Sequence, residues 1–210
     1  MKKKFFTLAA LSLCMTLAVA QTINLPAPNK SKKTATVMEA LATRHSERSF
    51  SAQKLTDQEL SDLLWAACGK NREDGKLTAP TAMNRQEIRV FVFTDDKVSE
   101  YLPQTNQLQQ VATGDHRAIV AGRQEAVKTA PVMLVLVADM DKFKSNDQRA
   151  QTMVSVDAGI VCQNVNIYCE AVGLVTVPRA TMDHDAIRKL LGLNENQIPL
   201  LNNPVGYKAK

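Results

Sequence analysis

The chain has 210 residues, of which 45% are hydrophobic, and this is enough for one domain with a full buried core. Its formal net charge is +5, but Lys2, Lys3 and Lys4 lie in a leader without acidic residues, so the rest of the chain carries only +2. A charge this small excludes the strongly basic surface that is typical of nucleic-acid-binding proteins.

Residues 1–20 have the three parts of a secretory signal peptide. Three lysines precede an apolar stretch from Phe5 to Leu17, and Ala18-Val19-Ala20 forms a cleavage site of small residues. The apolar stretch is too short for a membrane span, which needs about 20 residues. We therefore expect cleavage after Ala20 and export, to the periplasm.

Residues 21–35 are rich in Pro, Asn, Ser and Lys, and this composition predicts a linker before a single domain at residues 36–210. The domain contains three cysteines, an odd number, which implies a free thiol or a bridge to another chain. Cys162 and Cys169 lie about 10 Å apart along a predicted helix, which is too far for a disulfide. We interpret them, with Cys68, as buried structural thiols.

The first half of the domain predicts two helices and a long loop. A short helix is expected from Thr36 to Thr43, and a second begins at a capping box of Thr56 and Glu59. Residues 69–84 contain turn formers and few aliphatic side chains, which indicates a loop. The apolar positions of the second helix recur at the spacing of a buried face: Leu60, Leu63, Leu64 and Ala67.

The second half predicts strands and helices in mixed order, without a regular βαβ repeat. The helix at 155–172 is apolar nearly all round, which indicates burial in the domain or against a partner. The predicted strands are Ile88–Thr94, Pro131–Ala138, Leu174–Val177 and Val205–Tyr207, and the predicted helices are Asp115–Lys128, Ser155–Val172 and Asp183–Leu191.

The most informative motif is the pentapeptide Arg44-His45-Ser46-Glu47-Arg48, directly after the first predicted helix. Guanidinium groups offer planar pairs of donors to phosphate oxygens, and a serine hydroxyl adds a directional hydrogen bond. Basic residues at the end of a helix also complement the helix dipole. The pentapeptide alone therefore leaves a phosphate site and a helix end as alternatives.

Two other segments combine with this motif. Ala79-Pro80-Thr81-Ala82-Met83-Asn84-Arg85-Gln86 precedes a predicted strand, and Leu174-Val175-Thr176-Val177-Pro178-Arg179-Ala180 follows the long helix. The sequence lacks the G-x-S-x-G, H-E-x-x-H, CxxC and Walker patterns of hydrolytic, metal and nucleotide sites. We expect no metal.

Together these segments resemble the nitroreductase family of FMN-dependent oxidoreductases. R-H-S-x-R resembles the family's phosphate motif, A-P-T-A-M-N-R-Q its S-P-S-x-x-N-x-Q loop, and G-L-x-T-V-P its G-L-x-x-x-P turn. The ending P-V-G-Y-K resembles the last core strand, so order and spacing agree over residues 36–210. The resemblance implies a dimeric nitroreductase-like α+β fold, with a central mixed, mainly antiparallel sheet flanked by helices.

The resemblance also assigns residues to the FMN phosphate. Arg44 and Ser46 would bind it, His45 would fix the same turn, and Arg48 would lie near the phosphate or the flavin N1–C2 carbonyl. Family members usually continue into a C-terminal arm with a phosphate-binding Arg or Lys. Here Lys208 is expected to take that part, with Lys210 as the other candidate.

The remaining assigned residues would contact the flavin ring and come from two subunits of a homodimer. Those expected from the partner subunit are Pro80, Thr81, Ala82 and Asn84. Those expected to face the isoalloxazine are Pro178, Arg179 and Ala180, with a backbone N–H near Ala180 directed at N5.

The implied activity is transfer of hydride or electrons through FMN to a small organic acceptor, nitroaromatic-like or quinone-like, in a ping-pong sequence. No catalytic side chain is expected, because the flavin carries the chemistry. The electron donor would be NAD(P)H or, given the leader, an unknown extracytoplasmic donor. The alternatives are a flavin-binding or partner-binding protein with little turnover, and an oxidase that uses oxygen. We expect pocket walls at residues 69–77 and 102–115.

Overall fold

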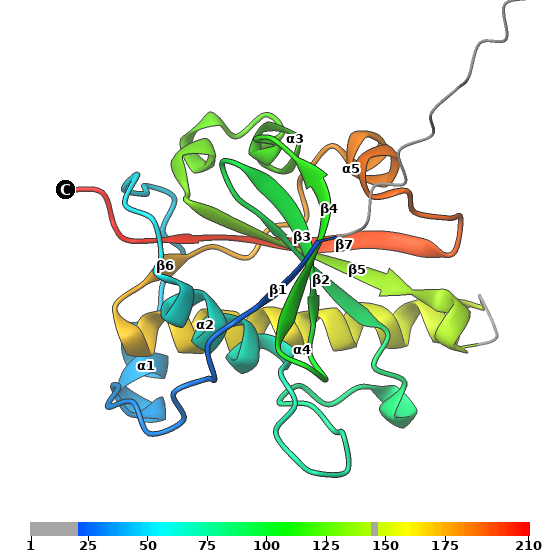
Figure 1. Ribbon diagram of the computed structural model, residues 1–210, viewed down its shortest axis with the longest axis horizontal. Coiled ribbons are helices and arrows are strands. Elements are labelled where there is room, and N and C mark those ends of the chain that lie inside the picture. Colours follow the sequence, from blue (N-terminus) through cyan, green and yellow to red (C-terminus); the bar gives the residue numbers. More distant parts are fainter. Residues whose placement is uncertain (1–20, 144–146) are drawn as a thin grey trace, which may run out of the picture.

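The computed structural model describes residues 21–143 and 147–210 (Figure 1). The expected signal peptide and its cleavage site lie outside these residues. Within them, a seven-stranded sheet has the order β1-β4-β3-β2-β5-β7-β6, and its pairings are antiparallel. The α+β fold, expected to have a mainly antiparallel sheet, is confirmed. The strands are β1 (Thr22–Asn24), β2 (Ile88–Phe93), β3 (Lys97–Leu102), β4 (Gln107–Thr113), β5 (Val132–Asp139), β6 (Val175–Thr176) and β7 (Gln197–Gly206).

Helices cover both faces of the sheet (Figure 1). One face carries α1 (Val37–Thr43), α2 (Asp57–Cys68) and α4 (Gln148–Val172), and the other carries α3 (Arg117–Ala121) and α5 (His184–Leu191). Short 3₁₀ turns are η1 (Ala82–Asn84), η2 (Glu125–Thr129) and η3 (Met140–Phe143).

Strand β5 lies at the centre and is buried on both faces, as its unbroken apolar run predicts. Leu134 and Leu136 belong to the core that α2 and α4 complete, whereas Met133, Val135 and Val137 belong to the core under α3 and α5. Alternate side chains of a strand point to opposite faces, so one strand supplies both cores.

Helix α4 is longer than predicted and runs across one face of the sheet (Figure 1). It begins at Gln148 rather than Ser155, because the Asp147 side chain accepts a hydrogen bond from the Ala150 N–H at 2.8 Å and caps the earlier turn. It ends at Gly173, which is left-handed with φ +78°. Its outer face is exposed in the single chain, and Val156 there is 52% exposed.

Three expectations differ from the structure. The predicted helix at 115–128 is divided into α3 and η2, because the chain turns at Gly122 with φ +58°. Residues 102–115, expected to form a pocket wall, contain β4, which pairs with β3 in a hairpin. The last strand is ten residues long, although Pro199 and Pro204 argue against a strand. They are tolerated because the outer edge of β7 pairs with β6 only at Val205 and Gly206.

The segment at 21–35, expected to be a linker, packs against the domain. It contains β1, which pairs with β4. The Ser61 hydroxyl donates to the Pro26 carbonyl at 2.6 Å, and the Asn29 N–H donates to Asp62 Oδ1 at 2.7 Å. Backbone pairing and these bonds to side chains give hydrogen-bond partners to backbone groups of a segment whose composition resembles a loop.

None of the helices within residues 21–143 and 147–210 has the length and hydropathy of a membrane span. Cys68, Cys162 and Cys169 are free and buried, which confirms their structural interpretation.

Candidate functional site

The Arg44–Arg48 pentapeptide lies at a junction of three segments. Helix α1 ends at Thr43, and the Arg44 N–H closes its last turn on the Ala40 carbonyl at 2.9 Å. Arg44 itself has φ −54° and ψ 132°, so the chain leaves the helix there and becomes extended. The pentapeptide is therefore an exit from the helix and not part of its last turn.

Backbone hydrogen bonds then hold the extended segment against the C-terminal strands. The Glu47 N–H donates to the Thr176 carbonyl of β6 at 3.0 Å, and the Ser51 N–H donates to the Tyr207 carbonyl at 2.8 Å. The Ala209 N–H donates back to the Ser49 carbonyl at 3.2 Å. The predicted phosphate motif, the turn after α4 and the chain end thus meet at one place.

Glu47 organises the middle of the motif. Its Oε1 accepts hydrogen bonds from the N–H groups of Arg48 at 2.8 Å and Ser49 at 3.0 Å. Its Oε2 lies 3.1 Å from Lys208 Nζ. The Ser49 N–H, Lys208 and the Arg48 N–H together lower the pKa of Glu47 to about 2. Lys208, expected at the phosphate, is therefore tied to Glu47 and lies beside the motif.

Three donor side chains of the motif remain available. Within the described part of the chain, the side chains of Arg44, Ser46 and Arg48 make no hydrogen bond or ion pair. Ser46 and Arg48 are exposed and Arg44 is half-buried, so a ligand could reach them. His45 Nδ1 lies 3.1 Å from the Thr43 carbonyl, which ties the ring to the turn. This set of donors suits an anion such as a phosphate monoester.

Arg179 departs from its expected place. Its side chain is only 6% exposed, and its guanidinium donates to the Val120 and Ala121 carbonyls at 3.2 and 2.7 Å. It also donates to Gln124 Oε1 at 3.0 Å and Asn202 Oδ1 at 2.9 Å. The guanidinium is therefore buried and joins α3 to β7 by hydrogen bonds.

Burial, and then the charge of Arg48, lower the pKa of Arg179. The hydrogen bond from the Glu47 N–H to the Thr176 carbonyl, two residues before Pro178, brings the Pro178–Ala180 turn into the same region as the pentapeptide. Pro178 and Ala180 on either side are exposed, so their surfaces stay open to a ligand.

The loop Pro80–Asn84 has an unusual backbone. Met83, Asn84 and Gln86 have φ of +54°, +53° and +50°, a left-handed conformation that costs a non-glycine residue about 1 kcal/mol or more. Two side chains hold this shape. Thr81 Oγ1 accepts the Gln86 N–H at 2.8 Å, and Asp157 Oδ2 of α4 accepts the Ala82 N–H at 2.7 Å.

This loop and the pentapeptide do not come together within one chain. The loop is attached to α4 at Asp157, whereas the segment entering α1 is attached at Ala171, where the Ala35 N–H donates to the carbonyl at 3.0 Å. Fourteen residues of helix separate these points, about 20 Å along the axis. In Figure 1, α1 and the chain end lie towards one end of α4.

A cavity of about 320 Å³ lies beside this loop, and its walls are mainly apolar. Neither of the two segments expected to form pocket walls, residues 69–77 and 102–115, lines this cavity. The lining residues are Ala82, Met83, Phe143, Asp147, Arg149, Ala150 and Met153.

The sequence analysis missed a buried pair of acids behind the loop. Glu87 is fully buried, Asp157 is 4% exposed, and neither carboxyl oxygen of Glu87 has a hydrogen-bond partner among the described residues. Desolvation, and then the neighbouring Asp157, raise the pKa of Glu87. An acid directly before an apolar strand and another inside an apolar helix are the signals that could have indicated them. Among the described residues, no cluster of three or more His, Cys, Asp or Glu could hold a metal.

Comparison with known proteins gives consistent matches. A family model described as the nitroreductase family matches residues 41–207. A Methanocaldococcus jannaschii protein, MJ1384, whose name assigns it provisionally to the nitroreductases, is 29% identical over 182 residues, covering 82% of this chain and 91% of that protein.

Solved structures agree with this match. A crystal structure from Ralstonia eutropha JMP134, provisionally titled a nitroreductase, is 31% identical with a TM-score of 0.84 and covers 90% of both chains. The NADPH:FMN oxidoreductase of Vibrio harveyi, solved with NAD⁺, shares the fold at 21% identity and a TM-score of 0.64, covering 83% of this chain and 69% of that one.

Proposed function

This chain belongs to the nitroreductase family, and on that premise we propose that it is a flavin-dependent oxidoreductase that binds FMN at the Arg44–Arg48 turn. The observation that carries the proposal is the free donor set of Arg44, Ser46 and Arg48 on an ordered turn. Two guanidinium groups and a hydroxyl without protein partners fit the oxygens of a phosphate monoester.

Two further features of the turn favour this ligand. The Glu47 carboxylate accepts the N–H groups of Arg48 and Ser49 and pairs with Lys208, which keeps its negative charge engaged. The C-terminal residues lie against the turn, so Lys208 contributes positive charge beside it. In this proposal Lys208 supports the phosphate site indirectly, through Glu47.

We propose that a homodimer completes the site. Within one chain, the loop Pro80–Asn84 is attached to α4 about 20 Å from the pentapeptide's end of that helix, so it cannot close over a flavin bound there. The outer face of α4 is exposed and carries Val156 and Gly159, which a second copy could cover. A partner on this face would bring its own loop to the flavin.

Flavin, when bound, would supply the hydride and electron chemistry. The chain's residues would bind and orient it. Arg44 and Ser46 hold the phosphate, Arg48 adds positive charge near the ring, and Pro178 and Ala180 offer an open surface beside Arg48. The donor and a small organic acceptor, nitroaromatic-like or quinone-like, would use the site one after the other, in a ping-pong sequence. The apolar cavity at Met83 suits such a planar molecule.

The leader at residues 1–20 leads us to propose export to the periplasm, where free NAD(P)H is not the expected donor. The physiological donor would then be another reduced molecule of that compartment. For this reason the experiment below uses dithionite as reductant, which makes the result independent of the donor.

The test is the absorbance spectrum of the purified mature protein mixed with FMN, followed by reduction with dithionite and reoxidation in air. We expect a bound flavin spectrum that bleaches and recovers. Replacing Arg44 with Ala removes a charge-assisted contact of about 1.5–3 kcal/mol, so the Kd for FMN should rise about 10- to 100-fold without unfolding.

The control is Lys189→Ala, which removes an exposed cation on α5, away from the chain end in Figure 1, and should leave the FMN Kd unchanged. Circular dichroism of each variant checks the fold. If Arg44→Ala binds FMN as tightly as the parent protein, the phosphate is held elsewhere and the assignment fails.

A further inference from the structure

Two buried acids meet directly behind the loop that is expected to touch the flavin. Glu87 directly precedes β2 and has no exposed surface, and Asp157 lies in the middle of α4 and is 4% exposed. If both were ionised, neither carboxyl oxygen of Glu87 would have a donor among the described residues. A proton held between Glu87 and Asp157 gives one Glu87 oxygen a partner and removes one of the two buried charges, since a neutral carboxyl can donate to a carboxylate.

The pair is physically connected to the loop. Asp157 Oδ2 accepts the Ala82 N–H at 2.7 Å, and Gln86, the neighbour of Glu87, donates its N–H to Thr81 Oγ1 at 2.8 Å. The loop between these bonds holds Met83 and Asn84 in the left-handed region. Strained backbone of this kind persists only where surrounding contacts over-determine it, and the bond to Asp157 is one such contact.

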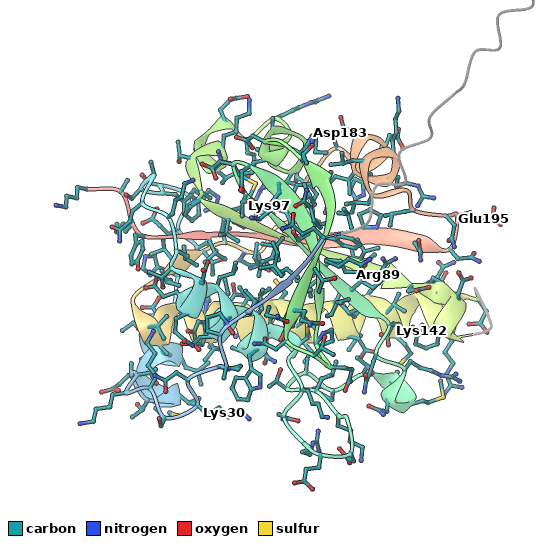
Figure 2. The ribbon with its side chains drawn as sticks, in the orientation of Figure 1. Lys30, Arg89, Lys97, Lys142, Asp183 and Glu195 are labelled. Atoms are coloured by element: carbon teal, nitrogen blue, oxygen red, sulfur yellow. The ribbon has the colours of Figure 1, made fainter. Side chains whose placement is uncertain are left out.

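The other charges around Glu87 do not replace this proton. Lys142 of η3, labelled in Figure 2, is exposed and lowers the pKa of Glu87 less than burial and Asp157 raise it. Asp139 of β5 donates its backbone N–H to the Glu87 carbonyl at 2.9 Å and adds a further acid nearby. Arg85 donates Nη1 to the Lys142 carbonyl at 3.0 Å, and no hydrogen bond or ion pair joins it to Glu87.

We propose that Glu87 and Asp157 share one proton and act as positioning residues that hold the loop Pro80–Asn84 in the shape that contacts the flavin. Loss of the proton leaves two carboxylates facing each other in a buried site. Their repulsion then loosens the contact from Asp157 to Ala82. This inference rests on the proposed function, because the loop's task is taken from it.

The first test uses the apo protein, so that it does not depend on flavin. Burial and Asp157 raise the pKa of Glu87 to about 8 from 4.5, so the folded state keeps a proton that the unfolded state loses. The proton's contribution to stability is therefore complete below pH 4.5, falls as pH rises, and levels off above about 8.

Glu87→Gln keeps a permanent donor towards Asp157 and cannot ionise. Its melting temperature relative to the parent protein should rise steadily from pH 4.5 to about 8 and then stay constant. Asp157→Asn keeps an acceptor for Ala82 and removes the negative neighbour, so the upper end of this window should move to lower pH. Glu195→Gln, an exposed acid labelled in Figure 2, is the control and should show no such rise.

The second test measures FMN affinity against pH. If the flavin-competent loop requires the shared proton, the Kd of the parent protein should rise about tenfold per pH unit above pH 8, whereas that of Glu87→Gln should stay flat.

If the parent protein and Glu87→Gln respond identically to pH in both tests, the shared proton is overturned, although the proposed function stands. If the apo protein shows the window but FMN affinity is independent of pH, the positioning role is overturned. A protein that binds no flavin contradicts the proposed function, and the apo window still tests the shared proton.

Discussion

At the scale of single residues, Arg179 shows how a motif residue can serve the fold. Its guanidinium donates to the Val120 and Ala121 carbonyls at the end of α3 and to two amide oxygens, and it is 6% exposed. Arg179→Met has similar length but leaves those buried acceptors unpaired. We expect a loss of about 3 kcal/mol in the free energy of unfolding, measured by urea denaturation of the apo protein.

The same variant should bind FMN with an unchanged Kd under conditions where it is folded, because the guanidinium does not face the ligand. Arg179→Lys keeps the charge but not the planar set of donors, so its stability should lie between those of the parent protein and Arg179→Met. A variant with parent-like stability and tenfold weaker FMN binding would contradict the structural role.

At the scale of elements, the end of α4 sets where the next segment begins. Gly173 has φ +78°, and its N–H closes the helix on the Cys169 and Glu170 carbonyls. The Leu174 N–H also donates to the Cys169 carbonyl, at 2.9 Å. No atom lies within 4 Å of a Cβ built there, so a side chain would cost only the left-handed backbone. Gly173→Ala should therefore lose about 1–2 kcal/mol in thermal denaturation.

Gly173→Asn is the matched comparison, because asparagine tolerates the left-handed region better than alanine does. We expect its loss to be smaller than that of the alanine variant. An alanine variant as stable as the parent protein would show that the helix can end in another way.

At the scale of the whole molecule, the exposed outer face of α4 and the distance between the two halves of the proposed site fit the proposed second subunit. Val156→Glu places a charge on this face, where the parent side chain is 52% exposed. We expect the variant to be monomeric by light scattering and to lose FMN, because the Pro80–Asn84 loop would no longer reach the flavin.

Val111→Glu is the control, since Val111 is 39% exposed on β4, on a strand far from α4 in the sheet order. It should remain dimeric and flavin-bound. A Val156→Glu monomer that keeps its FMN would mean that one chain holds a complete site.

Local chemistry explains which parts of the fold were predictable. The capping box of Thr56 and Glu59, the apolar run of β5 and the helix ending at Gly173 each carry their signal within a few neighbouring residues. The β3–β4 hairpin was missed, and only the end of the proline-containing β7 was predicted, because pairing with neighbouring strands defines both. The packing of residues 21–35 against the domain was not predicted for the same reason, since it depends on contacts with β4 and α2.

The sequence by itself determined the family, the α+β class and the donor set at Arg44–Arg48, because these depend on residue types at short, regular spacing. Only the tertiary structure decided that Arg179 faces inward, that Lys208 pairs with Glu47, and that Glu87 meets Asp157 behind the loop. It also decided that the two halves of the site lie far apart along α4. Such facts depend on contacts between distant segments, and a side chain's partner there is set by packing rather than by its neighbours in sequence.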